Sequence, residues 1–462
     1  MSSAGITTER LAAYEVLRRT FEDGAWTDRA FTATAARHEL SGRSLAQAHR
    51  LAYGSVQRRG TSDHLIAALS RRPLERIDGA VVAALRLGLF ELLYSDGPSD
   101  HAAVDQAVEL AKWGLRHDRS PAARMKAASG FVNALLRRAV REREQLLEAL
   151  DDSTPKGAAI THSYPLWMVE MWWRELGAIE ARLLLAAMNE PTETALRVNR
   201  LRADPDHVAT QLREAGVEVS GPGPGDLLHP SAAIVVDRAG EAVIARFATG
   251  EALAQSRGSQ AVVELLDAKP GERVLDLCSG PGIKTAAIGA QMKGEGELVS
   301  VELDRRRADE VRVVCARAGV DNLRIEVADA AEADLGAGYD RVLVDPPCSD
   351  LGTLGSRPDA RWRKSPETIE RLATLQRRVL TRATRALAPG GTLVYSTCTI
   401  SENENEAVAI DLLRRASGLV ADDLGAVHQR LASRRDSRFL QLLPQRDHTT
   451  GFFCARFRRD GA

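Results

Sequence analysis

Residues 273–304 read RVLDLCSGPGIKTAAIGAQMKGEGELVSVELD. The stretch opens with a short apolar run typical of a buried parallel strand, turns at Gly280 and Gly282, and then becomes helical. The following strand ends in Glu302 and Asp304, about 22 residues beyond the glycines, which is close to the spacing expected for a ribose-binding carboxylate. The pattern predicts an α/β domain whose glycine turn brings backbone close to a ligand.

Two further predicted strands also end in acids. Residues 323–328 lead into Asp329, and residues 341–344 lead into Asp345. Open α/β sheets bind ligands at this carboxyl edge. A nicotinamide site fits less well, because Lys284 and Thr285 stand where the dinucleotide fingerprint needs its third glycine. An S-adenosylmethionine site accounts for the turn and the acids, since that cofactor carries adenosine without a pyrophosphate.

Two cysteines follow the ends of predicted strands, Cys348 in VDPPCS (residues 344–349) and Cys398 in VYSTCT (residues 394–399). Cytosine C5 becomes nucleophilic enough to accept a methyl group once a thiolate has added to C6. A carboxylate such as Asp345 then holds a proton on N3, and a second thiol helps to remove the C5 proton. Small buried cysteines at strand ends are the commoner case, so each cysteine alone favours a packing role.

Together, residues 275–285, Asp345-Pro346-Pro347-Cys348 and Ser396-Thr397-Cys398 resemble the motifs of the Sun family of RNA (cytosine-5) methyltransferases. The resemblance implies that Cys398 attacks C6 and Cys348 assists release, with Asp345 and Lys284 beside them. DNA cytosine-5 methyltransferases attack with the cysteine of their Pro-Cys motif, so Cys398 favours RNA. The implied cofactor contacts are Cys278, Ser279, Gly280, Pro281, Gly282, Lys284, Asp304 (ribose hydroxyls), Asp329 (adenine amino group) and Asp345.

The sequence departs from this family at three places. Ile283 replaces a usual glycine, Ser256 a usual aspartate, and Gly355-Ser356 a usual arginine pair. The first could narrow the cofactor turn, and the last removes positive charge from a loop expected to meet RNA.

Cys398 needs activation, because a thiol with a pKa of about 8.5 is only a few per cent thiolate at neutral pH. Residues 401–404 (SENE) predict a capping box that begins a helix, whose N-terminus lowers a nearby thiol pKa. Acidic side chains there oppose this effect, so we expect Lys284 to supply compensating positive charge.

The first 145 residues have helical periodicity and predict a helical bundle, with residues 81–94 as a central buried helix. They carry 22 Lys and Arg residues against 17 Asp and Glu, a surplus of five. The stretches 51–56, 85–88, 101–104 and 131–138 resemble the NusB-type RNA-binding module, which within the Sun family marks the bacterial enzymes that methylate 16S ribosomal RNA. RNA contact by the pairs Arg58-Arg59, Arg71-Arg72 and Arg137-Arg138 is weighed equally against ordinary solvated surface.

A polar break at residues 151–155 precedes a small α+β module. Strands are predicted at 195–199 and 217–219, a helix at 204–215, and a turn at 221–225. Arg197 and Asn199 match a family motif, for which RNA contact is favoured over sheet packing. The predicted domains are a NusB-like helical domain (1–150), an α+β linker domain (151–245) and a Rossmann-like methyltransferase domain (246–462).

The composition is that of a soluble enzyme, with 462 residues, 27% charged residues and a formal charge of −1. Five cysteines without C-x-x-C spacing indicate neither a zinc site nor a disulfide framework, so no metal is expected. The first residues lack the apolar core of a signal peptide, and a cytoplasmic monomer is expected.

The sequence thus favours methylation of a cytidine in naked or partly assembled 16S rRNA, because the base must leave its stack to reach Cys398. Two alternatives stay open. A tRNA cytosine-5 methyltransferase would share the catalytic residues, and a non-catalytic RNA-binding assembly factor would bind no S-adenosylmethionine.

Overall fold

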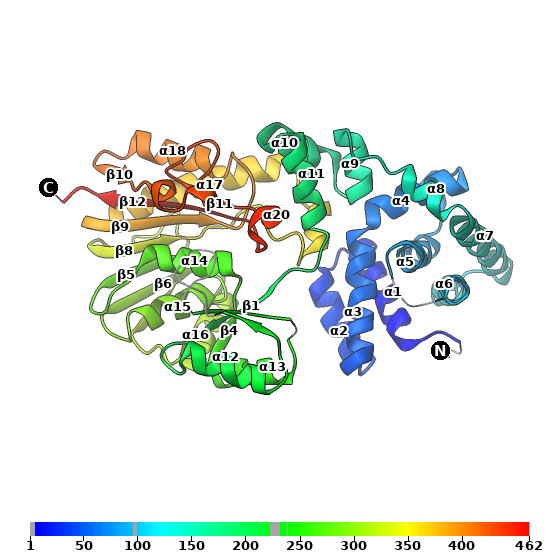
Figure 1. The fold of residues 1–462 in the computed structure, drawn as a ribbon, viewed down its shortest axis with the longest axis horizontal. Helices are drawn as coiled ribbons and strands as arrows, with labels where there is room; N and C mark the ends of the chain where they lie inside the picture. The colour runs from blue at the N-terminus through cyan, green and yellow to red at the C-terminus, as the bar shows by residue number, and fades with distance from the viewer. Residues whose placement is uncertain (1–4, 96–98, 222–231, 238, 462) are drawn as a thin grey trace. The chain divides into compact units, whose positions relative to one another are not determined.

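The computed structural model describes residues 5–95, 99–221, 232–237 and 239–461. Its contacts divide the chain into two compact units (Figure 1). The first comprises Met1–Asn189 with Ser356–Arg363, and the second comprises Glu190–Gly355 with Lys364–Ala462. The expected limits at residues 150 and 245 stay predictions. No helix in the described part of the chain is long and apolar enough to cross a membrane.

The first unit is helical, as predicted. Its α-helices are α1 (Thr8–Phe21), α2 (Thr27–Arg37), α3 (Gly42–Gln57), α4 (Arg59–Ser70), α5 (Gly79–Tyr94), α6 (Asp100–His117), α7 (Ala122–Arg141), α8 (Arg143–Glu148), α9 (Pro155–His162), α10 (Leu166–Leu176) and α11 (Ala178–Ala187). Two short 3-10 helices accompany them, η1 (Leu74–Arg76) and η2 (Pro358–Trp362).

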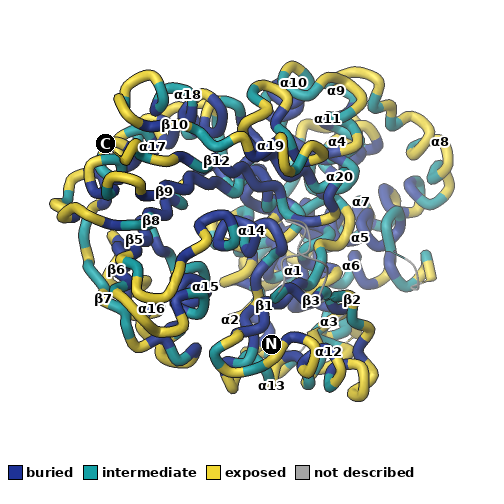
Figure 2. The backbone as a smooth tube through the Cα atoms, turned by 60° about the vertical axis from the view of Figure 1, so that its left-hand side comes forward, coloured by how far each residue is buried: buried dark blue, intermediate teal, exposed yellow. Residues whose placement is uncertain are grey.

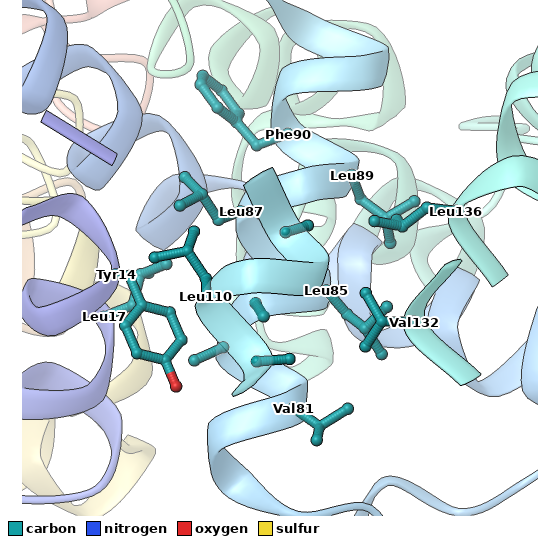
Figure 3. Packing of buried hydrophobic residues seen from close by; sticks show 14 of the residues in the cluster. Tyr14, Leu17, Val81, Leu85, Leu87, Leu89, Phe90, Leu110, Val132 and Leu136 are labelled. Atoms are coloured by element: carbon teal, nitrogen blue, oxygen red, sulfur yellow. The ribbon is translucent and has the colours of Figure 1, made fainter. Parts of the chain in front are cut away.

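Helix α5 is the centre of this bundle. It is apolar around nearly its whole circumference, and residues 80–92 are all buried. Its leucines pack against α1, α6 and α7 (Figure 3). Two polar residues also pair inside the core, where Arg10 donates to Glu91 at 2.7 Å. Because a helix that is apolar all round has to be covered on every side, this segment sets the arrangement of the bundle.

The arginine pairs that the sequence placed at helix ends make contacts within this unit. Arg58 lies over the ring of Tyr94 at 4.5 Å, and Arg72 lies over Phe131 at 5.4 Å. Arg138 donates to Glu142 and to the carbonyl of Leu69. These contacts give Arg58, Arg72 and Arg138 structural roles, so the presence of these arginines alone does not indicate RNA binding.

The second unit opens with a small antiparallel sheet in the order β2-β3-β1-β4. Its elements are β1 (Thr194–Val198), α12 (Pro205–Glu214), β2 (Val219–Ser220), β3 (Ala233–Val236), α13 (Glu241–Thr249) and β4 (Ala252–Ala254). The predicted strand and helix near residues 195–215 are confirmed. The predicted turn at 221–225 lies almost wholly outside the described residues.

Arg197 and Asn199, predicted to favour RNA contact, are instead buried, which makes that prediction wrong. Arg197 donates to the side-chain oxygen of Gln255 at 2.9 Å. Asn199 donates to the carbonyls of Gly250 and Ala318. Both side chains therefore hold the small sheet together and join it to the rest of the second unit.

The larger sheet has the order β10-β12-β9-β8-β5-β6-β7, with β11 paired to β12. Its elements are α14 (Arg257–Leu266), β5 (Arg273–Leu277), α15 (Ile283–Gln291), β6 (Glu297–Glu302), α16 (Arg305–Ala318), β7 (Leu323–Val327), β8 (Tyr339–Val344), α17 (Pro366–Ala386), β9 (Leu387–Thr397), α18 (Glu406–Arg415), β10 (Leu419–Ala421), α19 (Leu424–Val427), η3 (Gln429–Leu431), β11 (Leu440–Leu442), α20 (Pro444–Asp447) and β12 (Phe452–Arg459).

Strands β9, β8, β5, β6 and β7 are parallel, and β12 lies antiparallel to β9. Two apolar cores lie against this sheet, one including residues of α14, α15 and α16 and the other including residues of α17 and α18. The central strands are mostly buried (Figure 2). Burial on both faces explains their near-continuous apolar sequence, and the parallel order brings the carboxyl ends of β5 to β9 to one edge.

Candidate functional site

Cys348 and Cys398 meet at the carboxyl edge of the larger sheet. Cys348 follows β8 and Cys398 follows β9, which pair in parallel. The two Sγ atoms lie 3.2 Å apart. Cys348 is buried, at 7% exposure, and Cys398 is half-buried. The sequence located both cysteines at strand ends, and the strand order makes them neighbours.

Glycines allow the loops around the thiols to touch. Gly352 donates its N–H to the carbonyl of Cys398 at 3.0 Å, and Gly451 donates to the carbonyl of Gly352 at 2.9 Å. A Cβ atom on Gly352 would lie 2.2 Å from the carbonyl oxygen of Gly451. Only a residue without a side chain fits there, so backbone contact fixes the positions of both cysteine loops.

The expected capping box after Cys398 is wrong. Helix α18 begins at Glu406, and residues 402–405 form turns before it. Glu404 instead accepts from the backbone N–H of Ser349 at 2.9 Å and from Gln376 at 3.0 Å. Ser349 needs a buried acceptor, and this need outweighs the local capping pattern. Glu404 therefore supports the Cys348 loop rather than a helix start.

Asp345 and Lys284 form an ion pair beside the thiols. Their Nζ and Oδ2 atoms lie 2.7 Å apart, and Ser396 donates to Oδ1 of Asp345 at 2.9 Å. Burial favours the neutral amine of Lys284, but the Asp345 carboxylate outweighs burial and raises the pKa of Lys284. The lysine is charged as expected, yet its closest partner is Asp345 rather than the nucleophile.

Asp350 is a site residue that the sequence analysis missed. Its Oδ1 accepts from Cys398 Sγ at 3.2 Å and from Cys348 Sγ at 3.7 Å. Its Oδ2 pairs with Nζ of Lys364 at 3.1 Å. Asp350 has a φ of 58°, a left-handed conformation that turns the loop back toward Cys398. The signal in the sequence that could have identified Asp350 is its position two residues after Cys348.

The resting site keeps both thiols protonated at neutral pH. The hydrogen bond with Cys348 favours a Cys398 thiolate, but burial and the carboxylates of Asp350 and Asp345 outweigh it and raise the pKa of Cys398. The same hydrogen bond, together with burial, raises the pKa of Cys348 well above its usual range. Formation of a thiolate therefore requires a change at the site, such as the arrival of a substrate or a cation.

The glycine turn lies between β5 and α15. Gly282 has a φ of 88°, and a Cβ atom on it would lie 2.8 Å from Cα of Val311. Cys278 is also left-handed, with a φ of 62°, and burial raises the pKa of its thiol far above the usual range. Ser279 donates its backbone N–H to the carbonyl of Val301 at 3.1 Å, which ties the turn to β6.

The two acids after β6 differ in position. Glu302 is buried at the end of the strand, and its Oε2 accepts from the N–H of Gly280 at 2.9 Å. Asp304 caps α16, where its Oδ1 accepts from the backbone N–H groups of Arg306 and Arg307. Hydrogen bonds from Arg307 and Arg306 hold the pKa of Asp304 below its usual value. Glu302 therefore faces the glycine turn, whereas Asp304 is engaged in capping.

Two more carboxylates lie near this edge. Asp329 lies two residues after the end of β7 and accepts from the N–H of Ala331 at 2.8 Å. Asp276 is buried inside β5 and accepts from Thr285 Oγ1 at 2.6 Å. Burial raises the pKa of Asp276 to about 7.

The residues present fit S-adenosylmethionine. A positive-φ turn precedes α15, buried Glu302 accepts from the N–H of Gly280 in this turn, and the strand ends nearby carry Asp329 and Asp345. Space is open at Gly280, where a Cβ atom would meet nothing within 4 Å. Fold and site together define a methyltransferase that uses S-adenosylmethionine.

Comparisons with known proteins identify the family. Residues 263–458 match the 16S rRNA methyltransferase RsmB/F family, residues 7–141 the NusB family, and residues 164–228 the RsmF/B-like ferredoxin-like domain. The chain belongs to the RsmB/F methyltransferase family. It is 30% identical to the probable ribosomal RNA small subunit methyltransferase B of Bacillus subtilis, over 98% of this chain and 99% of the relative.

Other relatives and solved structures are also similar to this chain. The putative methyltransferase Rv1407 of Mycobacterium tuberculosis is 33% identical, over 97% of this chain and 96% of the relative. The crystal structure of PH0851 has the same fold, with a TM-score of 0.79 and 24% identity over 98% of this chain and 99% of that one. NSun6 from Pyrococcus horikoshii, solved with SFG, has a TM-score of 0.57 and 20% identity over 64% of this chain and 99% of that one.

Proposed function

We propose that this enzyme transfers a methyl group to C5 of a cytidine in 16S rRNA through a covalent adduct between a cysteine and C6. The observation that carries the proposal is the pair of thiols, 3.2 Å apart, with the Asp345 carboxylate on the neighbouring strand end. Two thiols and an acid are the groups that addition to C6, protonation at N3 and removal of the C5 proton require.

Cys398 is the nucleophile. As its sulfur forms a bond to C6, the thiol proton of Cys398 passes through the Asp345 carboxylate to N3, and the electron pair of the 5,6 double bond moves to C5. S-adenosylmethionine, when bound, would supply the electrophilic methyl group for C5 and would leave as S-adenosylhomocysteine. Cys348, having released its own proton to solvent, then takes the C5 proton. The 5,6 double bond re-forms, N3 returns its proton through Asp345, and Cys398 leaves as the thiol. Lys284 keeps Asp345 in place through its ion pair.

Cofactor binding is assigned to the glycine turn and the acids at the strand ends. Residues 278–282 approach the cofactor through their backbone, Asp329 binds the adenine amino group, and Lys284 and Asp345 lie at the methyl end. We assign the ribose hydroxyls to Glu302 rather than to the expected Asp304, because Glu302 lies at the end of β6 against the glycine turn, whereas Asp304 caps α16.

A paired substitution tests this assignment. Charged hydrogen bonds contribute about 1.5–3 kcal/mol, so Glu302→Gln should weaken S-adenosylmethionine binding about 10- to 100-fold. Asp304→Asn is the matched control, because asparagine caps a helix as well as aspartate does, and its affinity should stay near that of the parent. Isothermal titration calorimetry measures both. If Asp304→Asn weakened binding more than Glu302→Gln did, the ribose hydroxyls would be assigned to Asp304 instead.

The proposed substrate is naked or partly assembled small-subunit RNA in the cytoplasm, bound by a monomer. The names of the relatives and the match to the NusB family over residues 7–141 support this choice. A tRNA substrate is the competing possibility.

The decisive experiment uses methyl-labelled S-adenosylmethionine, protein-free 16S rRNA and the full chain. The parent should produce 5-methylcytidine, Cys348→Ala should trap an RNA-linked protein band on a denaturing gel, and Cys398→Ala should yield neither. Cys315→Ala, a buried cysteine on α16, is the control and should behave like the parent. Methylation of tRNA instead would overturn the substrate, and failure to modify any RNA would favour an assembly factor.

A further inference from the structure

Three metal-ligating atoms converge where the two cysteine loops meet. The sulfurs of Cys348 and Cys398 lie 3.2 Å apart. Asp350 Oδ1 lies 3.2 Å from the sulfur of Cys398 and 3.7 Å from that of Cys348. All three atoms fall within 4.8 Å of one another. The proposed methylation uses both sulfurs but leaves the position of Asp350 unexplained.

The triangle has nearly the dimensions of a tetrahedral zinc site. Zinc–sulfur bonds of about 2.3 Å and zinc–oxygen bonds of about 2.1 Å place two sulfurs about 3.8 Å apart and a sulfur and an oxygen about 3.6 Å apart. The separation between Cys348 and Asp350 already matches, and the other two are about 0.5 Å short. Side-chain rotation at Cys398, which is half-buried, would supply this difference.

The surrounding charge suits a divalent cation. Two thiolates and one carboxylate carry three negative charges, and Lys364, on the other oxygen of Asp350, carries one positive charge. A divalent cation offsets most of this negative charge, to which buried Glu404 beside the Cys348 loop also contributes. The nearby Asp345 and Lys284 neutralise each other. Because Lys364 binds Oδ2 of Asp350, Oδ1 can bind a metal as a single oxygen ligand. The contact with Lys364 also orients the Asp350 side chain.

We propose that Cys348, Cys398 and Asp350 form a binding site for a thiophilic divalent cation, such as Zn²⁺, which holds the enzyme in a reversibly blocked state. Thiolate ligands select zinc and related metals over magnesium and calcium. Binding forms two metal–sulfur bonds and one metal–oxygen bond, and both thiol protons pass to solvent. A water molecule takes the fourth position.

The cation and the substrate base compete for the same sulfur. Metal coordination withdraws electron density from the Cys398 sulfur and fills the space through which C6 must approach, so the bound state is inactive until a chelator removes the metal. This site goes beyond the proposed methylation, because metal binding needs neither RNA nor S-adenosylmethionine.

Cadmium provides a direct test. The metal-free full chain is titrated with Cd²⁺ while the ultraviolet charge-transfer band of cadmium–thiolate bonds is followed. The band should saturate at one cadmium ion per chain, fall when Zn²⁺ is added, and persist in excess Mg²⁺. Cys348→Ala and Cys398→Ala should each lose the saturable band. Asp350→Asn should weaken affinity at least about 10-fold, since loss of even a supporting outer residue costs that much.

Cys315→Ala is the matched control, because this thiol is buried in α16 and should leave the titration unchanged. Circular dichroism confirms that each variant is folded. The proposed site would be refuted if no charge-transfer band saturated at one cadmium ion per chain. A saturable band that survives in Cys348→Ala or Cys398→Ala would also refute it. An unchanged affinity in Asp350→Asn would overturn the three-ligand assignment. Methylation assays are separate, so inactive but cadmium-binding protein would count against the proposed function alone.

Discussion

Asp276 makes the stability of the larger sheet depend on pH. Its side chain is 1% exposed within β5, and burial raises its pKa to about 7, against about 3.9 in an unfolded chain. The folded state therefore prefers the protonated acid. The contribution of Asp276 to stability is full below pH 3.9 and is lost as the pH rises through 7.

The magnitude follows from these two pKa values. Linkage predicts that Asp276 lowers the free energy of unfolding by about 1.5 kcal/mol at pH 5 and about 4 kcal/mol at pH 8, relative to the protonated acid. Asp276→Asn keeps an acceptor for Thr285 but does not titrate. The free energy of unfolding of the variant, relative to that of the parent, should therefore rise by about 1.5–2.5 kcal/mol between pH 5 and pH 8.

Hydrogen exchange of peptides from β5 and α15 is the appropriate assay, because a chain of two compact units need not unfold in one step. Parent and variant are compared at the same pH, so intrinsic exchange rates cancel. A difference between the two proteins that stays constant, within about 0.5 kcal/mol, from pH 5 to pH 8 would refute the reasoning.

Two other predictions concern backbone contact and a buried ion pair. Gly352→Ala places a Cβ atom 2.2 Å from the carbonyl of Gly451, and a shift of about 1 Å between the cysteine loops should lower the methylation rate about 100-fold. Gly130→Ala, on α7 with open space around it, is the control; equal rates for both variants would contradict the prediction. Glu91→Leu leaves the buried Arg10 guanidinium unpaired and should destabilise the helical unit by about 3–5 kcal/mol in urea unfolding followed by tryptophan fluorescence. Adding Arg10→Met to Glu91→Leu replaces the ion pair with an apolar pair and should recover most of the lost stability. A further loss in the double variant would contradict this prediction.

The sequence was sufficient to predict the sheet and the location of both cysteines. The spacing of apolar residues and the composition indicate buried parallel strands. In such a sheet, a residue that directly follows a strand lies at the carboxyl edge. The resemblance implied that Cys348 and Cys398 act on the same base. Their closeness depends on the pairing of β8 with β9, which local pattern alone does not encode.

Other side chains depend on contacts that local pattern does not report. Arg197 reads as a cation available to RNA, but the fold places Gln255, distant in sequence, against it. The SENE stretch after Cys398 fits a capping box, yet Glu404 satisfies a buried N–H from another loop. Asp350 was missed because its role depends on a left-handed turn, which residue type only weakly predicts.

The antiparallel strand β12 has a consequence for synthesis of the protein. Before β12 leaves the ribosome, β9 is an uncovered edge of the sheet, and Gly451 is not yet present to support Gly352. The glycine turn and its acids, which come earlier in the chain, can already be in place. We therefore expect nascent chains to acquire the cofactor-binding edge before the aligned thiols, so an unfinished chain would not alkylate nearby RNA.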